Sequence, residues 1–261
     1  MTEVVTYEAR GRVAVITLNR PAARNAINGA VAAGLEAAID AMEADDEVWV
    51  GVLAAESTGQ QRPVFSAGAD LKEVQAGRGA ELSTERGGFA GFVYRERTKP
   101  VVAAVDGLAT AGGCEIVLTA DLVVASTRAE FGLAEVTRNL VAGAGGLFRL
   151  PRAIGRGAAM EAILTGNPIP ATRAHELGLV TRLVGPGEAF DEAVRLAHEI
   201  AANGPLAVRA SREVVLAAHT SDDDILRAMT DRAMRTVMGS DDLAEGLAAF
   251  IEKRPPRWTG R

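Results

Sequence analysis

The fold class follows from one stretch of sequence, residues 99–125, which reads KPVVAAVDGLATAGGCEIVLTADLVVA. Within it, Val101–Val105 is a β-branched run entered through Pro100, and such a run is typical of a buried strand. A glycine-rich loop follows and opens the apolar helical run 116–118, after which residues 122–125 form a second buried-type strand. Because strand and helix alternate in this way, the stretch predicts an α/β protein with parallel strands.

The alternation of strand and helix extends toward the N-terminus. Val13–Leu18 is another short β-branched run, and it predicts a strand that pairs as a hairpin with residues 4–7 across Gly11. Residues 27–42 carry apolar side chains near helical spacing, and residues 48–53 read as a buried strand. The N-terminal half is therefore expected to be a layered α/β structure.

Helical patterns dominate after Leu150 and cover residues 157–164, 172–177, 190–202, 206–218, 224–237 and 242–252. The last two of these follow Asp222 and Ser240, whose side chains are suited to accept hydrogen bonds from the first free N–H groups of a helix. We therefore divide the chain into an α/β core, residues 1–195, and a helical C-terminal region, residues 196–261.

The composition excludes several classes of protein. The 261 residues include 28 Lys and Arg against 34 Asp and Glu, and this net charge of −6, without a basic run, does not fit a nucleic-acid partner. Acidic residues interrupt the most apolar stretch, residues 101–125, so no bilayer span is expected. The single cysteine, Cys114, excludes an intrachain disulfide and a cysteine-based zinc site, and it fits a reducing cytoplasm. Residues 1–12 lack the apolar run of a signal peptide.

Common catalytic motifs are also missing. No P-loop or H-E-x-x-H motif occurs, and the three histidines lie in helical segments away from the glycine-rich loops, so a Ser-His-Asp triad is not expected. The run of residues 143–146, Gly-Ala-Gly-Gly, follows no clear strand and lacks the spacing of a dinucleotide-binding loop.

Two loops combine glycine with other small residues and offer a different kind of site. One reads FSAGADLK at residues 65–72, and the other reads DGLATAGGCE at residues 106–115. Small residues let a ligand approach the backbone, and free N–H groups from two loops could bind one oxygen that becomes negative during a reaction. The same glycines would also suit tight strand-to-helix turns.

Two acidic residues lie near these loops in otherwise apolar surroundings. Glu115 lies in the first turn expected for a helix, where the helix dipole alone favours a carboxylate. Glu135 follows the run at residues 131–134, and an exposed helix start would explain it equally well. Each residue becomes a catalytic candidate only in combination with the two loops.

The combined motifs resemble those of the crotonase (enoyl-CoA hydratase/isomerase) superfamily. The resemblance rests on FSAGADLKE at 65–73, KPVVAAVDGLA at 99–109, AGGCE at 111–115 and F-x-x-x-E at 131–135, and it extends to residues 18–26 and 249–254. It implies a spiral α/β fold of repeated β-β-α turns, with a C-terminal helical region that makes trimer and hexamer contacts. It also implies an acyl-CoA thioester as ligand.

The resemblance assigns roles to individual residues. The backbone N–H groups of Ala69 and Gly112 would form an oxyanion hole, and Glu115 and Glu135 would bind the reacting water. Because isomerases of the family typically keep only the second glutamate, the presence of both indicates hydration. Coenzyme A would contact six further residues, namely Arg24, Ala26, Ala67, Asp70, Leu71 and Lys253. No metal and no separate cofactor are implied, since coenzyme A is part of the substrate.

The predicted function is that of an enoyl-CoA hydratase, which adds water reversibly and syn to the 2,3 double bond of a 2-enoyl-CoA during degradation of fatty acids or related thioesters. The alternatives are double-bond isomerisation with Glu135 as proton shuttle, and non-catalytic binding of acyl-CoA. The sequence departs from the family at Ala111, where many hydratases have glycine, and at Leu147 and Phe148, which replace a common Thr-Gln. The glycine-rich segment 74–97 is expected to face the acyl group and to be mobile.

A homotrimer or homohexamer is expected on physical grounds as well. Residues 206–250 carry apolar side chains on more than one face of their predicted helices. A helix that is apolar on several faces must bury more surface than its own core can cover. A neighbouring subunit is the natural cover for the remaining faces.

Overall fold

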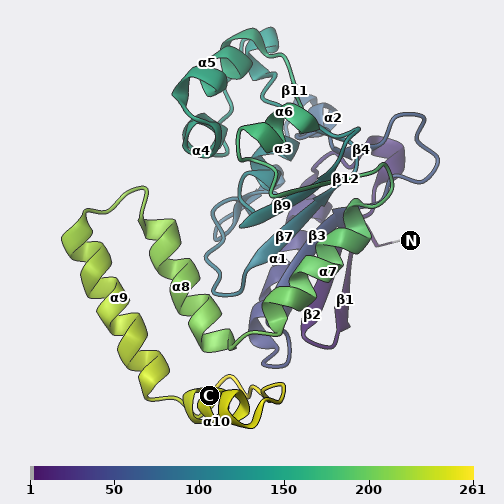
Figure 1. Cartoon of the computed structure of the whole chain (residues 1–261). Helices are drawn as coiled ribbons and strands as arrows, with labels where there is room; N and C mark the ends of the chain where they lie inside the picture. Colours follow the sequence, from purple (N-terminus) through teal and green to yellow (C-terminus); the bar gives the residue numbers. More distant parts are fainter. Residues whose placement is uncertain (1–2) are drawn as a thin grey trace.

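The computed structural model describes residues 3–261, and two of its sheets form the core. The larger sheet has six strands, in which a hairpin of the first two continues into four parallel neighbours (Figure 1). Its strands, in spatial order, are β1 (Val5–Arg10), β2 (Val13–Leu18), β3 (Val50–Ala55), β7 (Val101–Val105), β9 (Leu122–Ser126) and β12 (Arg182–Val184).

A second sheet of four short strands lies beside the first. Its spatial order is β11 (Ile169–Pro170), β10 (Glu130–Gly132), β8 (Leu108–Thr110) and β4 (Val64–Ser66). The chain passes from β3 to β4, from β7 to β8 and from β9 to β10, so each pair contributes one strand to each sheet. The first two pairs lead directly into helices α2 (Leu71–Gln75) and α3 (Gly112–Val117). The expected spiral of β-β-α turns is confirmed.

The hydrophobic core explains why the longer elements form where the sequence predicts them. Helix α1 (Gly29–Ala44) begins after Asn28, whose side chain accepts a hydrogen bond from Val31 N at 3.0 Å. Its apolar stripe, which includes Leu35 and Ile39, is fully buried against the larger sheet. The strand expected at residues 48–53 begins only at Val50, because that residue pairs with the first residue of β2.

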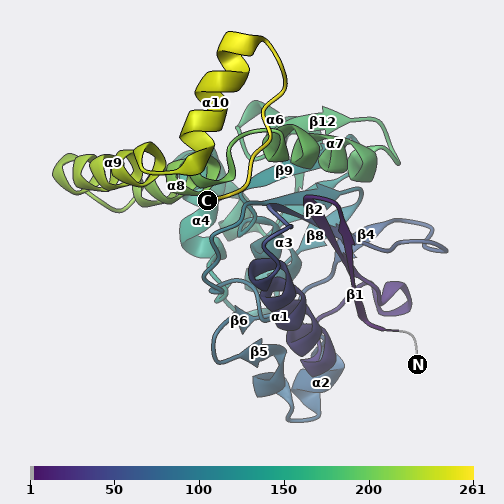
Figure 2. The same ribbon diagram turned by 90° about the horizontal axis from the view of Figure 1, so that it is seen from below.

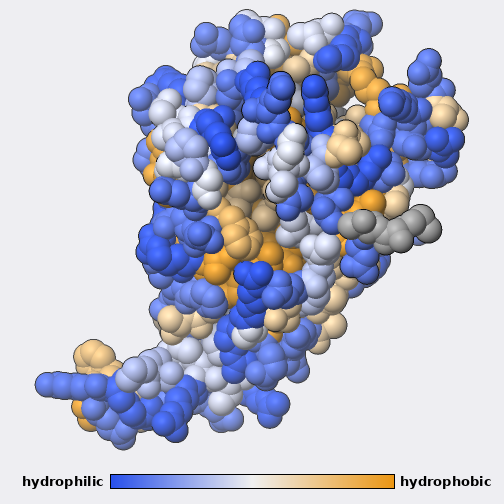
Figure 3. Space-filling view, turned by 90° about the vertical axis from the view of Figure 1, so that its right-hand side faces the viewer, coloured by the Kyte–Doolittle hydropathy of each residue, from blue (hydrophilic) through white to orange (hydrophobic). Residues whose placement is uncertain are grey.

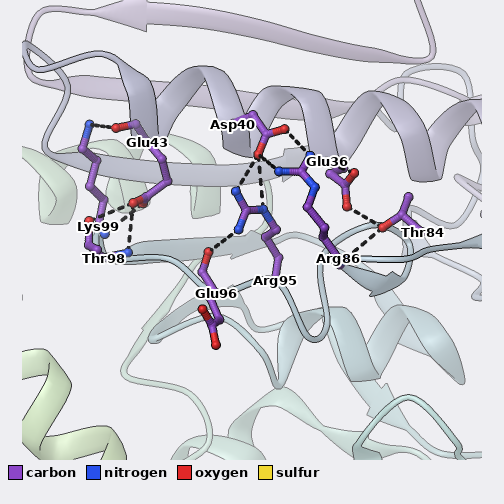
Figure 4. A network of polar contacts seen from close by, with 10 residues as sticks. Glu36, Asp40, Glu43, Thr84, Arg86, Arg95, Glu96, Thr98 and Lys99 are labelled. Atoms are coloured by element: carbon purple, nitrogen blue, oxygen red, sulfur yellow. Dashed lines mark hydrogen bonds and ion pairs between the residues drawn. The ribbon is translucent and has the colours of Figure 1, made fainter.

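The segment 74–97 is tied to α1 rather than lying free. It contains the 3-10 turn Gly79–Leu82 and a small hairpin of β5 (Ser83–Thr84) and β6 (Gly88–Phe89). The carboxylate of Asp40, in α1, forms ion pairs with Arg86 Nη2 at 2.5 Å and with Arg95 Nη2 at 2.6 Å (Figure 4). Because these ion pairs join the segment to a buried helix, they oppose the mobility expected of a glycine-rich stretch.

The remaining helices of the core lie along the chain after Glu135. A 3-10 turn, Glu135–Arg138, leads by a loop to α4 (Gly146–Ile154) and α5 (Arg156–Thr165), and α6 (Ala171–Glu176) precedes β12. Helix α7 (Ala189–Ala201) covers one face of the larger sheet, with Leu196, Ala197 and Ala201 buried beside strands β3 and β7. The domain boundary expected after residue 195 therefore falls inside a helix that packs as part of the core.

The C-terminal helices extend away from both sheets. They are α8 (Pro205–Ala217), α9 (Asp223–Met238) and α10 (Asp241–Glu252), and Figures 1 and 2 show the α8–α9 hairpin projecting from the body of the molecule. The expected caps are present, since Asp222 accepts from Ile225 N at 3.0 Å and Ser240 from Leu243 N at 3.3 Å. None of the helices within residues 3–261 is long and apolar enough to cross a membrane.

Candidate active site

The two glycine-containing loops lie side by side because the strands before them are neighbours. Strands β4 and β8 run parallel, with Val64 opposite Leu108, so their carboxyl ends meet at one edge of the second sheet. At this edge Gly68 has φ of +80°, and a side-chain carbon on it would lie only 2.8 Å from Gly112 N. A glycine is therefore needed at position 68 both for its conformation and for the contact between the loops.

Two backbone N–H groups at this contact have no acceptor within the described part of the chain. They belong to Ala69 and Gly112, the two residues expected to form the oxyanion hole. Gly112 is the first residue of α3, so its N–H points out of the helix without a partner. The aromatic ring of Phe89 packs against Gly112, and this contact places segment 74–97 at the site.

The Glu115 carboxylate is buried and held by backbone hydrogen bonds. The residue is 3% exposed, and its Oε1 accepts from Ala144 N at 2.7 Å and from Gly146 N at 2.9 Å. Burial raises the pKa of this carboxyl, whereas the two N–H groups and the charge of Arg149 lower it. The loop 143–146 thus binds an anion, but the anion is a side chain of the same protein.

The Glu135 carboxyl has a poorer set of partners. Glu135 begins the 3-10 turn after β10, and β10 runs parallel to β8, the strand that precedes Gly112 and Glu115. Its Oε2 is buried and has no hydrogen-bond partner among residues 3–261. Burial raises the pKa of Glu135, and the charge of Glu115 raises it further. Glu115 therefore lies close enough to Glu135 for its charge to act on that carboxyl.

Most of the residues expected to contact coenzyme A are also gathered here. The segment 24–27 runs beside the first loop, since Ala67 N donates to Arg24 O at 3.0 Å and Asp70 N donates to Ile27 O at 2.9 Å. Ala26 belongs to the same segment, and Leu71 begins α2 with 55% of its surface exposed. The structure brings these residues to the rim of the loop pair.

Asp70 and Lys253 differ from the other predicted coenzyme A contacts. The Asp70 carboxylate is engaged by Arg20 at 3.2 Å and by Lys72 N at 3.2 Å, so it already binds a cation and caps α2. Lys253 follows α10, which Figures 1 and 2 place at the opposite end of the molecule from α2. Within one chain, Lys253 does not join the site.

Several residues at the site carry no recognisable signal in the sequence. Arg20 anchors the rim by donating to Ala26 O at 2.6 Å as well as to Asp70, but a single arginine in an arginine-rich chain has no distinguishing pattern. The N–H groups of Ala144 and Gly146 were visible only as a glycine-rich loop without a spacing signature. Within residues 3–261, no cluster of three or more His, Cys, Asp or Glu side chains could hold a metal ion.

Known proteins resemble this chain in both sequence and fold. Residues 8–261 match the family described as Enoyl-CoA hydratase/isomerase. A probable enoyl-CoA hydratase of Rhizobium meliloti is 38% identical, with 99% of each chain covered, and a short-chain-enoyl-CoA hydratase of Clostridium acetobutylicum is 37% identical over 96% of this chain and 95% of its own. The crystal structure of an enoyl-CoA hydratase from Mycobacterium tuberculosis H37Rv superposes with a TM-score of 0.93 at 45% identity, and each chain is covered completely. The resemblance in the motifs thus extends to the whole chain and its fold, and the protein belongs to the enoyl-CoA hydratase/isomerase family.

Proposed function

We propose that the protein is an enoyl-CoA hydratase, which adds water reversibly and syn to the 2,3 double bond of a 2-enoyl-CoA in the degradation of fatty acids or related thioesters. One observation carries the proposal, namely that the Glu115 and Glu135 carboxyls lie together beside the free N–H groups of Ala69 and Gly112. The hydratase names of the relatives support it.

The two free N–H groups would polarise the thioester carbonyl. As water adds, negative charge moves onto the carbonyl oxygen, and the N–H groups of Ala69 and Gly112 are placed to bind it. The loss of one such donor typically costs about 2.7–4 kcal/mol of transition-state stabilisation. Because the donors are fixed backbone dipoles, we propose that catalysis uses no metal and no cofactor beyond the coenzyme A of the substrate.

We assign the base and the acid from the different surroundings of the two carboxyl groups. Burial raises the pKa of both, but the Glu115 Oε1 accepts two N–H groups and Arg149 is nearby, and these contacts favour its ionised form. Glu135 has a buried oxygen without a donor among residues 3–261 and an anionic neighbour, so we assign the retained proton to Glu135. Glu115 would therefore take a proton from water as the hydroxyl bonds to carbon 3, and Glu135 would give its proton to carbon 2. Proton transfer from Glu115 back to Glu135 completes the cycle.

The activity can be tested with crotonyl-CoA, because hydration removes its conjugated double bond and the associated ultraviolet absorbance. We expect Glu115→Gln and Glu135→Gln each to lower kcat by about 10²–10⁴, the usual contribution of a placed acid or base. Binding of a saturated acyl-CoA should change much less and serves as the control for an intact site.

The outcomes separate the hydratase from its alternatives. If the wild-type protein converts a 3-enoyl-CoA to the conjugated isomer without adding water, the activity is isomerisation. If it binds acyl-CoA but changes neither substrate, the protein is a binding protein. Wild-type turnover in either glutamate variant would remove that residue from the proposed mechanism.

We propose a homotrimer or homohexamer as the working form. Helix α9 packs on α8 but has no fully buried side chain in the described chain, and Lys253 is far from the other predicted coenzyme A contacts. A neighbouring subunit would cover α9 and would bring a copy of Lys253 to the bound coenzyme A. We also propose a reducing compartment such as the cytoplasm, since Cys114 is a buried free thiol.

A further inference from the structure

Arg149 lies near enough to Glu115 for its charge to act on that carboxyl, and its hydrogen bonds go to backbone carbonyl groups. It extends from α4, and its Nη1 donates to Ala144 O at 3.0 Å while its Nη2 donates to Val93 O at 2.5 Å. Its guanidinium also lies 5.2 Å from the centre of the Phe148 ring and 5.4 Å from that of Tyr94. Both hydrogen bonds use the fork geometry that only arginine provides.

These contacts act on the loop that holds Glu115. Ala144 carries both ends of the connection, because its carbonyl accepts from Arg149 and its N–H donates to Glu115 Oε1 at 2.7 Å. Tyr94 adds a third restraint by donating its hydroxyl to Gly143 O at 3.3 Å. Since three of the four residues in loop 143–146 are glycine, the backbone there has little stiffness of its own, and external contacts must set its conformation.

The second hydrogen bond of Arg149, to Val93 O, joins it to a segment that is fixed to the core. Val93 is buried, and its segment is tied to α1 through Arg95 and Asp40, as Figure 4 shows. A continuous set of polar contacts therefore runs from α1 to the Glu115 carboxylate. The charge of Arg149 also favours the ionised form of Glu115, whereas the other titratable groups facing this carboxylate, Glu135 and Cys114, do not.

We propose that Arg149 is a positioning residue for hydration, which clamps loop 143–146 so that the N–H groups of Ala144 and Gly146 hold Glu115 as an oriented base. This inference rests on the proposed hydratase function. It assigns Arg149 two separable contributions, a positive charge and a geometric clamp.

Three variants separate these contributions. Arg149→Met removes both, and Arg149→Lys keeps the charge but cannot reach both carbonyl groups. Arg152→Met is the matched control, because Arg152 lies on the same helix and against the same Phe148 ring, at 5.3 Å, but holds no part of the loop. Crotonyl-CoA hydration is measured across pH for kcat and KM, and amide hydrogen exchange is measured at Ala144 and Gly146 without substrate.

For Arg149→Met we expect kcat to fall about 10–100-fold, the usual cost of misplacing a catalytic group. The KM should change less than about 3-fold, because Arg149 is assigned no contact with coenzyme A. The acidic limb of kcat/KM should move to higher pH, since Glu115 loses a stabilising cation. Arg149→Lys should restore the position of that limb while kcat stays low, and exchange at Ala144 and Gly146 should be faster in both variants. Arg152→Met should match the wild type.

The proposal would be overturned by wild-type kcat and exchange in Arg149→Met, or by an equal loss in Arg152→Met. If Arg149→Met does not fold, Arg149→Lys decides alone, because wild-type kcat in that variant excludes the clamp. A wild-type protein that hydrates no enoyl-CoA would contradict the proposed function instead. The exchange rates at Ala144 and Gly146 would still show whether Arg149 holds the loop.

Discussion

Ala111 adopts a backbone conformation that alanine rarely takes. Its φ is +51° and its ψ is −130°, at the turn between β8 and α3. The surrounding bonds impose this geometry, because Ala111 N donates to Gly132 O at 2.8 Å and Ala111 O accepts from Cys114 N at 2.9 Å. Such a conformation costs a non-glycine residue about 1–3 kcal/mol, and here it aims the N–H of Gly112.

Replacing Ala111 with glycine should therefore stabilise the protein. We expect Ala111→Gly to raise the free energy of unfolding by about 1 kcal/mol, because the strain relieved exceeds the entropy that glycine adds to the unfolded chain. Urea denaturation measures the difference. Ala109→Gly, in the regular strand β8 two residues earlier, is the control and should destabilise by about 1 kcal/mol. A less stable Ala111→Gly variant would show that position 111 carries no strain.

The raised pKa of Glu115 links stability to pH. Burial makes the folded protein bind the proton of the Glu115 carboxyl more tightly than the unfolded chain does. The free energy of unfolding therefore falls as pH rises through and above the ordinary carboxyl range. Glutamine cannot ionise and avoids this loss. We expect Glu115→Gln to become more stable relative to the wild type as pH rises above the ordinary carboxyl range, as followed by thermal or urea unfolding. A stability difference that does not change with pH would contradict this assignment.

At the scale of elements, Asp121 joins the core to the first C-terminal helix. Its Oδ2 accepts from Val101 N at 2.8 Å and from Arg97 Nη2 at 3.1 Å, while its Oδ1 accepts from Arg212 Nε of α8 at 2.8 Å. All three charged side chains are nearly buried, with exposures of 5–13%. The carboxylate thus compensates two cations at the junction of β7 and α8.

Removing that carboxylate should be costly. We expect Asp121→Ala to lower the free energy of unfolding by about 3–5 kcal/mol, since it leaves buried arginine charge without a partner. The matched control is Glu213→Ala, because Glu213 lies on α8 next to Arg212 and pairs with Arg232 at 3.5 Å but is 63% exposed. The control should change stability by less than about 1 kcal/mol. Equal effects of the two substitutions in urea titrations would rule out a special role for the buried junction.

At the scale of the whole molecule, the C-terminal helices leave apolar surface uncovered. Met234 and Met238 of α9 are each 60% exposed, and Phe250 of α10 is 84% exposed. Figure 3 shows apolar atoms on the projecting lower part of the molecule, where Figure 1 places α10. Apolar surface of this extent marks a contact with another molecule or an aggregation hazard.

We expect light scattering to find an oligomer of three or six chains at micromolar concentration. Met234→Glu combined with Met238→Glu should shift the population toward smaller species, because charge would be buried at the subunit contact. If coenzyme A binding needs Lys253 of a neighbour, the dissociated form should also show a raised KM. An active monomer of 27.2 kDa would contradict both expectations.

Local patterns in the sequence were sufficient for the class of fold, and the family resemblance of the motifs named the candidate site residues. Val13–Leu18 and Val101–Val105 are strands with the predicted bounds, because a β-branched run is a local property. The motifs placed four candidate residues in or near the turns that follow strands, namely Ala69, Gly112, Glu115 and Glu135. In the structure these residues follow the ends of neighbouring strands. Their catalytic roles remain predictions.

Tertiary structure alone decided how these pieces meet. Strands β4, β8 and β10 have three residues each, too few to show a period, and they exist because they pair with one another. The α/β core ends with α7, because side chains of this helix are buried against the larger sheet. The pKa of Glu115 depends on burial by distant segments and on N–H groups 29 and 31 residues away in the sequence. Hydrogen bonding and desolvation act through space, so they become visible only after distant segments have folded together.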